Sequence, residues 1–280
     1  MNSIDIYDSL VILSLCINKI FTLLFREGLF TGENMRKLLT LFVFAVVFAG
    51  LFLTACDDDK NDGNDFDYGC VDYDGIEYDT LRLGNQLWMA ENLRSTHFRD
   101  GTPISLVSDS IQWPLLDTRA YCYYDNDSSR IEGNGMLYNG YAVMDLHNLA
   151  PDGWHIPTDE EWKELELYLG MNENALDSIW SRGSDEGSNL AGELALWWSG
   201  LLTDSPNLGS SGFNALPSGY RHSNGRYFFI GQNAYFWTST MYSDSEFWVR
   251  YLTKDDSGIG RHHQPIRNGF SVRCIRDTEQ

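Results

Sequence analysis

Basic residues are scarce in this chain of 280 residues, where 20 Lys and Arg stand against 40 Asp and Glu and give a formal net charge of −20. The whole imbalance falls after residue 55, because residues 1–55 hold four acidic and four basic side chains. Proteins that bind nucleic acid need clustered Lys and Arg to contact phosphates. We therefore expect no nucleic-acid partner, and a surface that is repelled by anionic headgroups.

Cysteine is also scarce, and its spacing argues against a thiolate metal site. No two of the five cysteines have a CxxC spacing, and none lies near a cluster of histidines. Downstream of a long apolar run that ends at Cys56, the chain has Cys70, Cys122 and Cys274. Three thiols allow one disulfide and leave one over, so three pairings are open.

A complete catalytic set is missing as well. Ser210 and Ser211 lack the strand-to-helix context of a nucleophile elbow. Glu160 is better explained as an acidic residue in the first turn of a helix than as a general acid or base. His262 and His263 would point to opposite faces of a strand, so we expect a surface loop there rather than a metal-binding pair. These absences predict a protein that is not an enzyme and needs no cofactor.

The most informative feature that is present is the apolar run that follows Arg36 and Lys37. A basic start, an apolar stretch and small residues before a cleavage point describe an export signal. Leu53–Cys56 resembles the lipobox of bacterial lipoproteins, which implies that residues 35–55 form a signal peptide and that Cys56 carries lipid. An 18-residue membrane anchor over Leu38–Ala55 is the alternative.

The segments on either side of this signal carry different expectations. Residues 1–34 show no cleavage signature, and we interpret them as a mis-called extension before a true start at Met35, with a start at Met1 left open. Residues 56–69 are acidic and almost free of apolar side chains, which is typical of a solvated tether. Acids directly after the lipidated cysteine resemble the surface-export signal of Bacteroidota lipoproteins. The resemblance implies a cell-envelope protein, anchored by lipid to the outer membrane and exposed at the cell surface.

Residues 70–280 form the predicted folded domain. Short β-prone pieces with Gly and Asn turn signals occupy its beginning and its end. Between them, Thr158 followed by Glu161 forms a capping box, and Gly170 suits the end of the same helix. Strands, then helices, then strands again predict an α+β domain.

Six ordered blocks between about residues 70 and 277 resemble the Fibrobacter succinogenes major paralogous domain. They read GNQLWMAENLR, YCYYDND, LAPDGWHIPTDEEWKELELYLG, GFNALPSGYR, AYFWTST and GFSVRCIRD. The segment WHIPTDEEW is also similar to sulfatase-modifying enzymes of C-type-lectin-like fold. This similarity implies a small, twisted, mostly antiparallel sheet with two or three helices and long irregular loops. The family resemblance further implies a Cys122–Cys274 disulfide, with Cys70–Cys274 as the other candidate.

The lectin analogy leads to a binding function, although the EPN, QPD and WND motifs of calcium-dependent sugar sites are missing. We expect a non-enzymatic binding module for a glycan or a protein ligand, held at the membrane through Cys56. An enzyme on the sulfatase-modifying scaffold and a structural component of an envelope assembly are the alternatives. Asp125 and Asp127 are also candidates for a structural calcium. The candidate contact residues are exposed rings and one polar loop: Tyr124, Asp125, Asn126, Asp127, Tyr220 and Tyr242.

Overall fold

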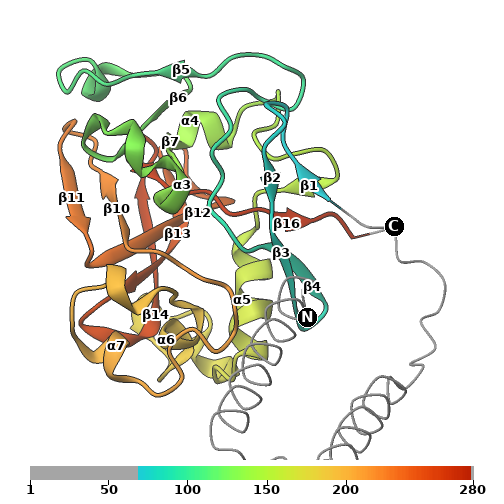
Figure 1. The fold of residues 1–280 in the computed structure, drawn as a ribbon, viewed down its shortest axis with the longest axis vertical. Helices are drawn as coiled ribbons and strands as arrows, with labels where there is room; N and C mark the ends of the chain where they lie inside the picture. Colours follow the sequence, from blue (N-terminus) through green and yellow to red (C-terminus); the bar gives the residue numbers. More distant parts are fainter. Residues whose placement is uncertain (1–68, 279–280) are drawn as a thin grey trace, which may run out of the picture. The chain divides into compact units, whose positions relative to one another are not determined.

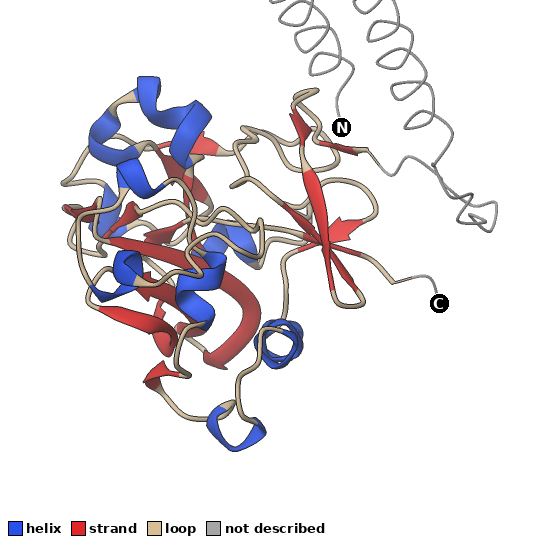
Figure 2. Ribbon diagram, turned by 60° about the horizontal axis from the view of Figure 1, so that its bottom comes forward, coloured by secondary structure: helices blue, strands red, loops and turns tan. Residues whose placement is uncertain are grey.

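The computed structural model describes residues 69–278, which belong to one compact unit, Asp67–Gln280. Short strands and long loops dominate this unit (Figures 1 and 2). The predicted signal peptide, the predicted lipidation site Cys56 and all but the last residue of the predicted tether lie outside the described residues. Within residues 69–278, no helix has the length and apolar character needed to cross a membrane.

The largest sheet has six strands and mixes distant parts of the chain. Five of its strands are joined by antiparallel pairings, while β5 and β6 run parallel. In spatial order the strands are β11 (Tyr227–Ile230), β10 (Ser218–Arg221), β15 (Gly269–Phe270), β7 (Leu137–Asn139), β6 (Ala120–Cys122) and β5 (Ser105–Leu106).

The longest strands form a separate antiparallel sheet of four. Its strands are β12 (Asn233–Ser243), β13 (Glu246–Thr253), β14 (Asp256–Pro265) and β9 (Trp180–Arg182). Register shifts follow Trp237 in the β12–β13 pairing. They bend the end of the hairpin, as extra residues in a ladder do.

A third sheet brings the two ends of the domain together. The C-terminal strand β16 lies between β4 and β8, with Ile275 opposite both Trp88 and His155. A two-stranded hairpin, β1 (Cys70–Val71) with β2 (Glu77–Tyr78), precedes this sheet in the chain. The sheet consists of β3 (Thr80–Leu83), β4 (Gln86–Met89), β16 (Ile275–Arg276) and β8 (Trp154–His155).

Helix α5 (Asp159–Tyr168) is the longest helix among the described residues. The predicted capping box is confirmed: the Glu161 amide donates to Thr158 Oγ1 at 3.1 Å, and the Thr158 amide donates to Glu161 Oε2 at 2.8 Å. Gly170 follows with φ 107°, a conformation that favours glycine. The other helices are short: α3 (Ile131–Asn134), α4 (Gly140–Val143), α6 (Glu186–Leu190) and α7 (Leu201–Asp204), with 3-10 turns η1 (Trp113–Leu115), η2 (Tyr124–Asn126), η3 (Ser128–Arg130), η4 (Glu173–Ala175) and η5 (Leu194–Leu196).

Aromatic side chains build most of the core. Large rings bury about 150–250 Å² each, which lets a domain of short strands assemble a stable interior. Trp88, Trp162 and Phe213 meet edge to face below α5, with ring centroids 5.0–5.7 Å apart. The prediction that Trp88, Trp154, Trp162 and Trp237 are core residues is confirmed, since each is at most 1% exposed.

The predicted fold class is confirmed at the level of a mixed α+β domain with mostly antiparallel strands. The expectation of one small sheet is corrected, because the strands are divided among sheets of six, four, four and two. Most strands have only two to four residues, and the strands are hydrogen-bonded into separate ladders.

Candidate functional site

Four aromatic side chains form a column at one end of the β12–β13–β14–β9 sheet. Trp180 stacks on His262 at a centroid distance of 4.1 Å, and His262 stacks on His263 at 4.5 Å. His263 in turn stacks on Tyr242 at 3.9 Å, with the two ring planes 10° apart. We call Trp180, His262, His263 and Tyr242 the ring column.

Three strands of the same sheet supply the ring column. Trp180 begins β9 and lies opposite Arg261 of β14, one residue before the histidines. On the other side of β14, His263 lies opposite Trp248 of β13, whose ring meets Tyr242 edge-on at 5.0 Å. The pairing of strands that are distant in sequence therefore assembles the column.

The two end rings of the column are its most exposed members. Trp180 is 59% exposed and Tyr242 is 51% exposed. Trp180 also has φ 69°, a left-handed backbone conformation that is a genuine outlier for a bulky residue. Such conformations cost about 1–3 kcal/mol and cluster at functional sites. The exposed and strained tryptophan marks this end of the column as a candidate contact surface.

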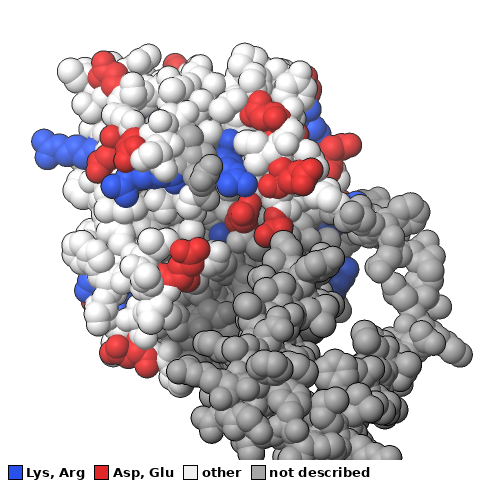
Figure 3. Space-filling view, viewed as in Figure 1, with Lys and Arg blue, Asp and Glu red and all other residues white. Residues whose placement is uncertain are grey.

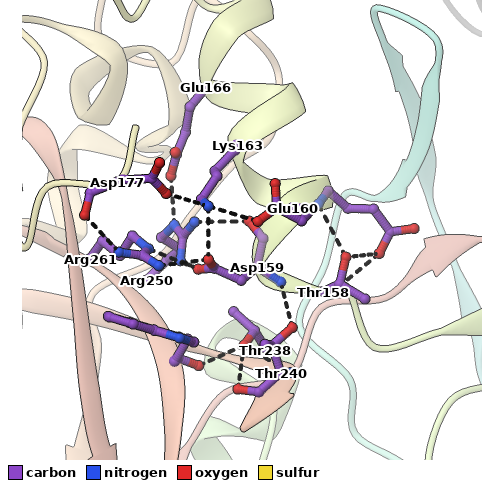
Figure 4. Close-up of polar contacts among 12 residues, drawn as sticks. Thr158, Asp159, Glu160, Lys163, Glu166, Asp177, Thr238, Thr240, Arg250 and Arg261 are labelled. Atoms are coloured by element: carbon purple, nitrogen blue, oxygen red, sulfur yellow. Dashed lines mark hydrogen bonds and ion pairs between the residues drawn. The ribbon is translucent and has the colours of Figure 1, made fainter. Parts of the chain in front are cut away.

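A second layer lies directly behind the column. The Arg261 guanidinium lies over the Trp248 ring, 3.6 Å from its centroid. The same guanidinium donates to Asp159 Oδ1 and Oδ2 at 2.9 and 2.7 Å and to the Asp177 carbonyl at 3.0 Å. Asp177 lies in the segment that leads into Trp180. Arg261 therefore contacts both the Trp248 ring and this segment, and Figure 4 shows its contact with Asp177.

Arg261 belongs to a buried charge network between α5 and the sheet (Figure 4). Arg250 donates to Glu166 Oε1 and to Asp159 Oδ1, each at 2.6 Å. Arg182 forms a two-point contact with Glu166 at 2.9 and 3.0 Å. Burial by itself would raise the pKa of Asp159, but the hydrogen bonds and charges of Arg261 and Arg250 hold it well below the usual value. Asp159 is therefore ionised, and the contacts of Asp159 and Glu166 with the three arginines anchor the helix on the sheet.

The two histidines of the column differ in their surroundings. His263 Nδ1 lies 3.2 Å from Glu246 Oε2, although it lacks the alignment of a hydrogen bond. Burial and the neighbouring charge of His263 lower the pKa of His262, against the opposing influence of Glu246. The lowered pKa favours the neutral form of His262, whose ring lies between those of Trp180 and His263.

Of the predicted contact residues, Tyr242 belongs to the ring column and the others do not. The prediction that Tyr124 is an exposed ring is wrong. It is only 6% exposed, because it packs against Tyr227 with ring centroids 5.2 Å apart. Tyr220 is half-buried among other rings, and its ring centroid lies 4.9 Å from that of Tyr235, with the ring planes tilted. These rings lie between β6, β10 and β12, where they contribute to the interior.

The predicted polar loop is largely engaged with its own neighbourhood. Asn126 donates to the Ser108 carbonyl at 3.1 Å and accepts from the Tyr227 hydroxyl at 2.8 Å. Asp127 accepts from the Ser129 hydroxyl at 2.6 Å, and Asp125 has φ 52°. Within residues 69–278, no three His, Cys, Asp or Glu side chains converge on a possible metal position. Calcium at Asp125 and Asp127 stays a prediction.

In the structure Cys70, Cys122 and Cys274 are all free thiols, so neither the expected Cys122–Cys274 disulfide nor the other candidate, Cys70–Cys274, is formed. Cys122 belongs to β6 and packs in a small hydrophobic cluster with Trp113. Cys274 precedes β16 and lies in the largest hydrophobic cluster. The topology separates the two blocks that the family resemblance had joined.

The sequence alone did not assign a functional role to Trp180, Trp248, His262 or His263. The expectation that His262 and His263 lie in a surface loop is corrected, since both are in β14. His262, His263 and Gln264 are all partly exposed, and the two imidazole rings stack at 4.5 Å. The adjacent histidines were the only signal available in the sequence.

Three histidines outside the ring column contact carboxylates, and their geometry can be compared with that of a catalytic triad. Asp100 and Thr102 both contact Nδ1 of His147, at 2.6 and 3.3 Å. A nucleophile–histidine–acid relay uses the two ring nitrogens separately, so this trio does not form one. His97 likewise meets Asp74 and Thr96 through Nδ1 alone. His155 meets carboxylates on both nitrogens, which leaves no position for a nucleophile.

The fold and the column together describe an α+β domain with exposed aromatic side chains at one end of a sheet. A family model, the Fibrobacter succinogenes major domain, matches residues 81–276. The chain belongs to this family. Comparisons with curated proteins and with solved structures gave no match.

Proposed function

We propose that this protein is a non-enzymatic binding module for a neutral glycan, and that the ring column is its contact surface. The observation that carries the proposal is the pair of exposed end rings, Trp180 and Tyr242, at the two ends of one stacked array. A lectin-like arrangement of loops, adopted by analogy, fits the short strands and long connections of the domain.

The chemistry of the column suits a sugar. A pyranose ring has a face of C–H groups that packs on an aromatic face and a rim of hydroxyl groups that need hydrogen-bond partners. The outer rings offer aromatic surface, while the partly exposed His262 and the carboxylate of Glu246 offer donors and acceptors nearby. Recognition sites of this kind combine apolar surface with a few placed polar groups.

The charge of the protein favours a neutral ligand over an acidic one. The net charge of −20 falls entirely after residue 55, and the face drawn in Figure 3 shows acidic side chains spread among wide uncharged areas. An anionic polysaccharide would be repelled at long range. A neutral glycan would not.

We further propose that the module is lipid-anchored through Cys56 to the outer membrane and faces the outside of the cell. The lipobox-like segment Leu53–Cys56 and the acidic tether after it support this placement. A surface position would bring the ring column into contact with glycans of the surroundings.

A glycan-array screen tests the proposal. The wild-type chain should bind a class of neutral glycans, and the variant Trp180→Ala/Tyr242→Ala should lose that signal. The control is Trp198→Ala, since Trp198 is 57% exposed but lies outside the column. Running the array with calcium and with a chelator tests the calcium prediction at Asp125 and Asp127. A blank array with folded protein would refute the glycan proposal.

A second candidate, a structural role in an envelope assembly, is favoured by one observation. Trp198 approaches the turn at Gly231, where its amide donates to the Gly231 carbonyl at 2.7 Å. Exposed apolar side chains lie on the η5–α7 segment and on β11 next to this turn, and such patches mark interaction surfaces. They are Leu194, Leu196, Trp198, Leu201 and Phe229, each at least 43% exposed. If Trp198→Ala abolished co-purification of an envelope protein while Trp180→Ala did not, this candidate would be favoured.

A further inference from the structure

Cys70 and Cys274 stand at the two ends of the folded domain, yet they occupy the same part of its interior. Cys70 begins β1 and is 1% exposed, while Cys274 precedes β16 and is fully buried. Both belong to the largest hydrophobic cluster.

A short path of strand pairings connects the two cysteines. Cys70 lies opposite Tyr78 in the β1–β2 hairpin, and the chain continues from Tyr78 to Thr80 of β3. Thr80 lies opposite Met89 of β4. The Met89 amide donates to the Cys274 carbonyl at 3.0 Å, and the Cys274 amide approaches Met89 Sδ at 3.3 Å. Strand partners lie about 5 Å apart, so this path places both cysteines in the same region of the interior.

The electrostatic surroundings agree with this proximity. Burial is the main cause that raises the pKa of Cys274 well above its ordinary value, and the charge of Cys70 adds to it. Burial likewise raises the pKa of Cys70 to about 12, and Arg276, two residues after Cys274, acts in the opposite direction. Buried thiols with raised pKa values react slowly. A bond between them would therefore form during folding, before the cluster closes.

Cys122 is in a different environment. It lies in β6 within the small cluster around Trp113, and burial raises its pKa to about 11 while Arg221 opposes the shift. A hydrogen bond with Tyr227 opposes the rise in its pKa as well. The odd thiol among the three is thus Cys122.

We propose that Cys70 and Cys274 form a disulfide when the chain folds in an oxidising compartment, and that Cys122 remains a free thiol. Two S–H bonds break and one S–S bond forms. The two electrons and two protons pass to the disulfide of a thiol–disulfide oxidant, which leaves as a dithiol. The bridge joins the first strand of the domain to the segment before the last and restrains both ends.

Differential alkylation of the full chain, isolated without reductant, tests the assignment. Free thiols are blocked with one reagent under denaturing conditions, and thiols released by reduction are labelled with a second. We expect the first label on Cys122, the second on Cys70 and Cys274, and a linked peptide containing both before reduction. The control Cys122→Ser should leave the linked peptide unchanged.

Two results would overturn the proposal: the first label on all three cysteines, or a linked peptide that contains Cys122. Since the measurement uses the wild-type chain, it does not depend on whether a variant folds. It is also independent of glycan binding, so either proposal can fail alone.

Discussion

Replacing Glu166 by Gln tests whether the buried charge network holds α5 on the sheet. Glu166 is 0% exposed and accepts three hydrogen bonds, two from Arg182 and one from Arg250. The amide has the same shape as the carboxylate, so packing is preserved while the negative charge is removed. Two buried guanidinium groups would then face a neutral side chain.

The expected cost is large because the arginines have few other partners. Arg250 keeps its contact with Asp159 at 2.6 Å, but Arg182 loses both charged contacts and retains a weak one to Met171 Sδ. Breaking a buried ion pair by removing one partner costs about 3–5 kcal/mol. With a urea dependence of about 2–3 kcal/mol per molar, the unfolding midpoint should fall by about 1–2 M.

Urea unfolding followed by tryptophan fluorescence measures this shift. The matched control is Glu164→Gln, since Glu164 is exposed on the same helix and should change stability by less than about 0.5 kcal/mol. If Glu166→Gln were as stable as the wild type to within about 1 kcal/mol, the reasoning that the network anchors α5 would be refuted.

Two further predictions concern the start of α5. Thr158→Ala removes the acceptor of the Glu161 amide and should cost about 1 kcal/mol in urea unfolding. Thr158→Ser should cost less, and equal losses would contradict the capping argument. Burial opposes protonation of His155, but Glu161 and Asp277 raise its pKa above 6.5. The stability that protonated His155 contributes is therefore complete at pH values below its pKa in the unfolded chain. It is lost as the pH rises through its higher pKa in the folded protein. Between about pH 6 and pH 9, the midpoint of urea unfolding should fall more for the wild type than for His155→Gln. If the midpoints of the two proteins fell equally with pH, the assignment of this stabilisation to His155 would be wrong.

Features that depend on neighbouring residues could be predicted from the sequence. The capping box at Thr158 and Glu161 and the glycine at position 170 are set by local backbone chemistry, and the structure has them as expected. The abundance of tryptophan led correctly to an aromatic core, because such large apolar rings are seldom left in water when a core is available. The α+β class followed from the order of the segments.

Features that depend on long-range pairing could not be predicted. The ring column needs the register of β14 against β9 and β13, and nothing near Trp180 in the sequence indicates that it meets His262. Tyr124 looked like a contact residue because its loop is polar, yet the ring turns inward against Tyr227. The separation of Cys122 from Cys274 likewise follows from the division of the strands into several sheets.

Titration calorimetry with the best neutral glycan from the array tests the central claim most directly. Trp180→Ala and Tyr242→Ala should each weaken binding by about tenfold or more, since each removes an exposed contact ring. Trp198→Ala should bind within about twofold of the wild type. Unchanged affinity in both column variants, or a loss confined to Trp198→Ala, would contradict the assignment of the ring column as the binding surface.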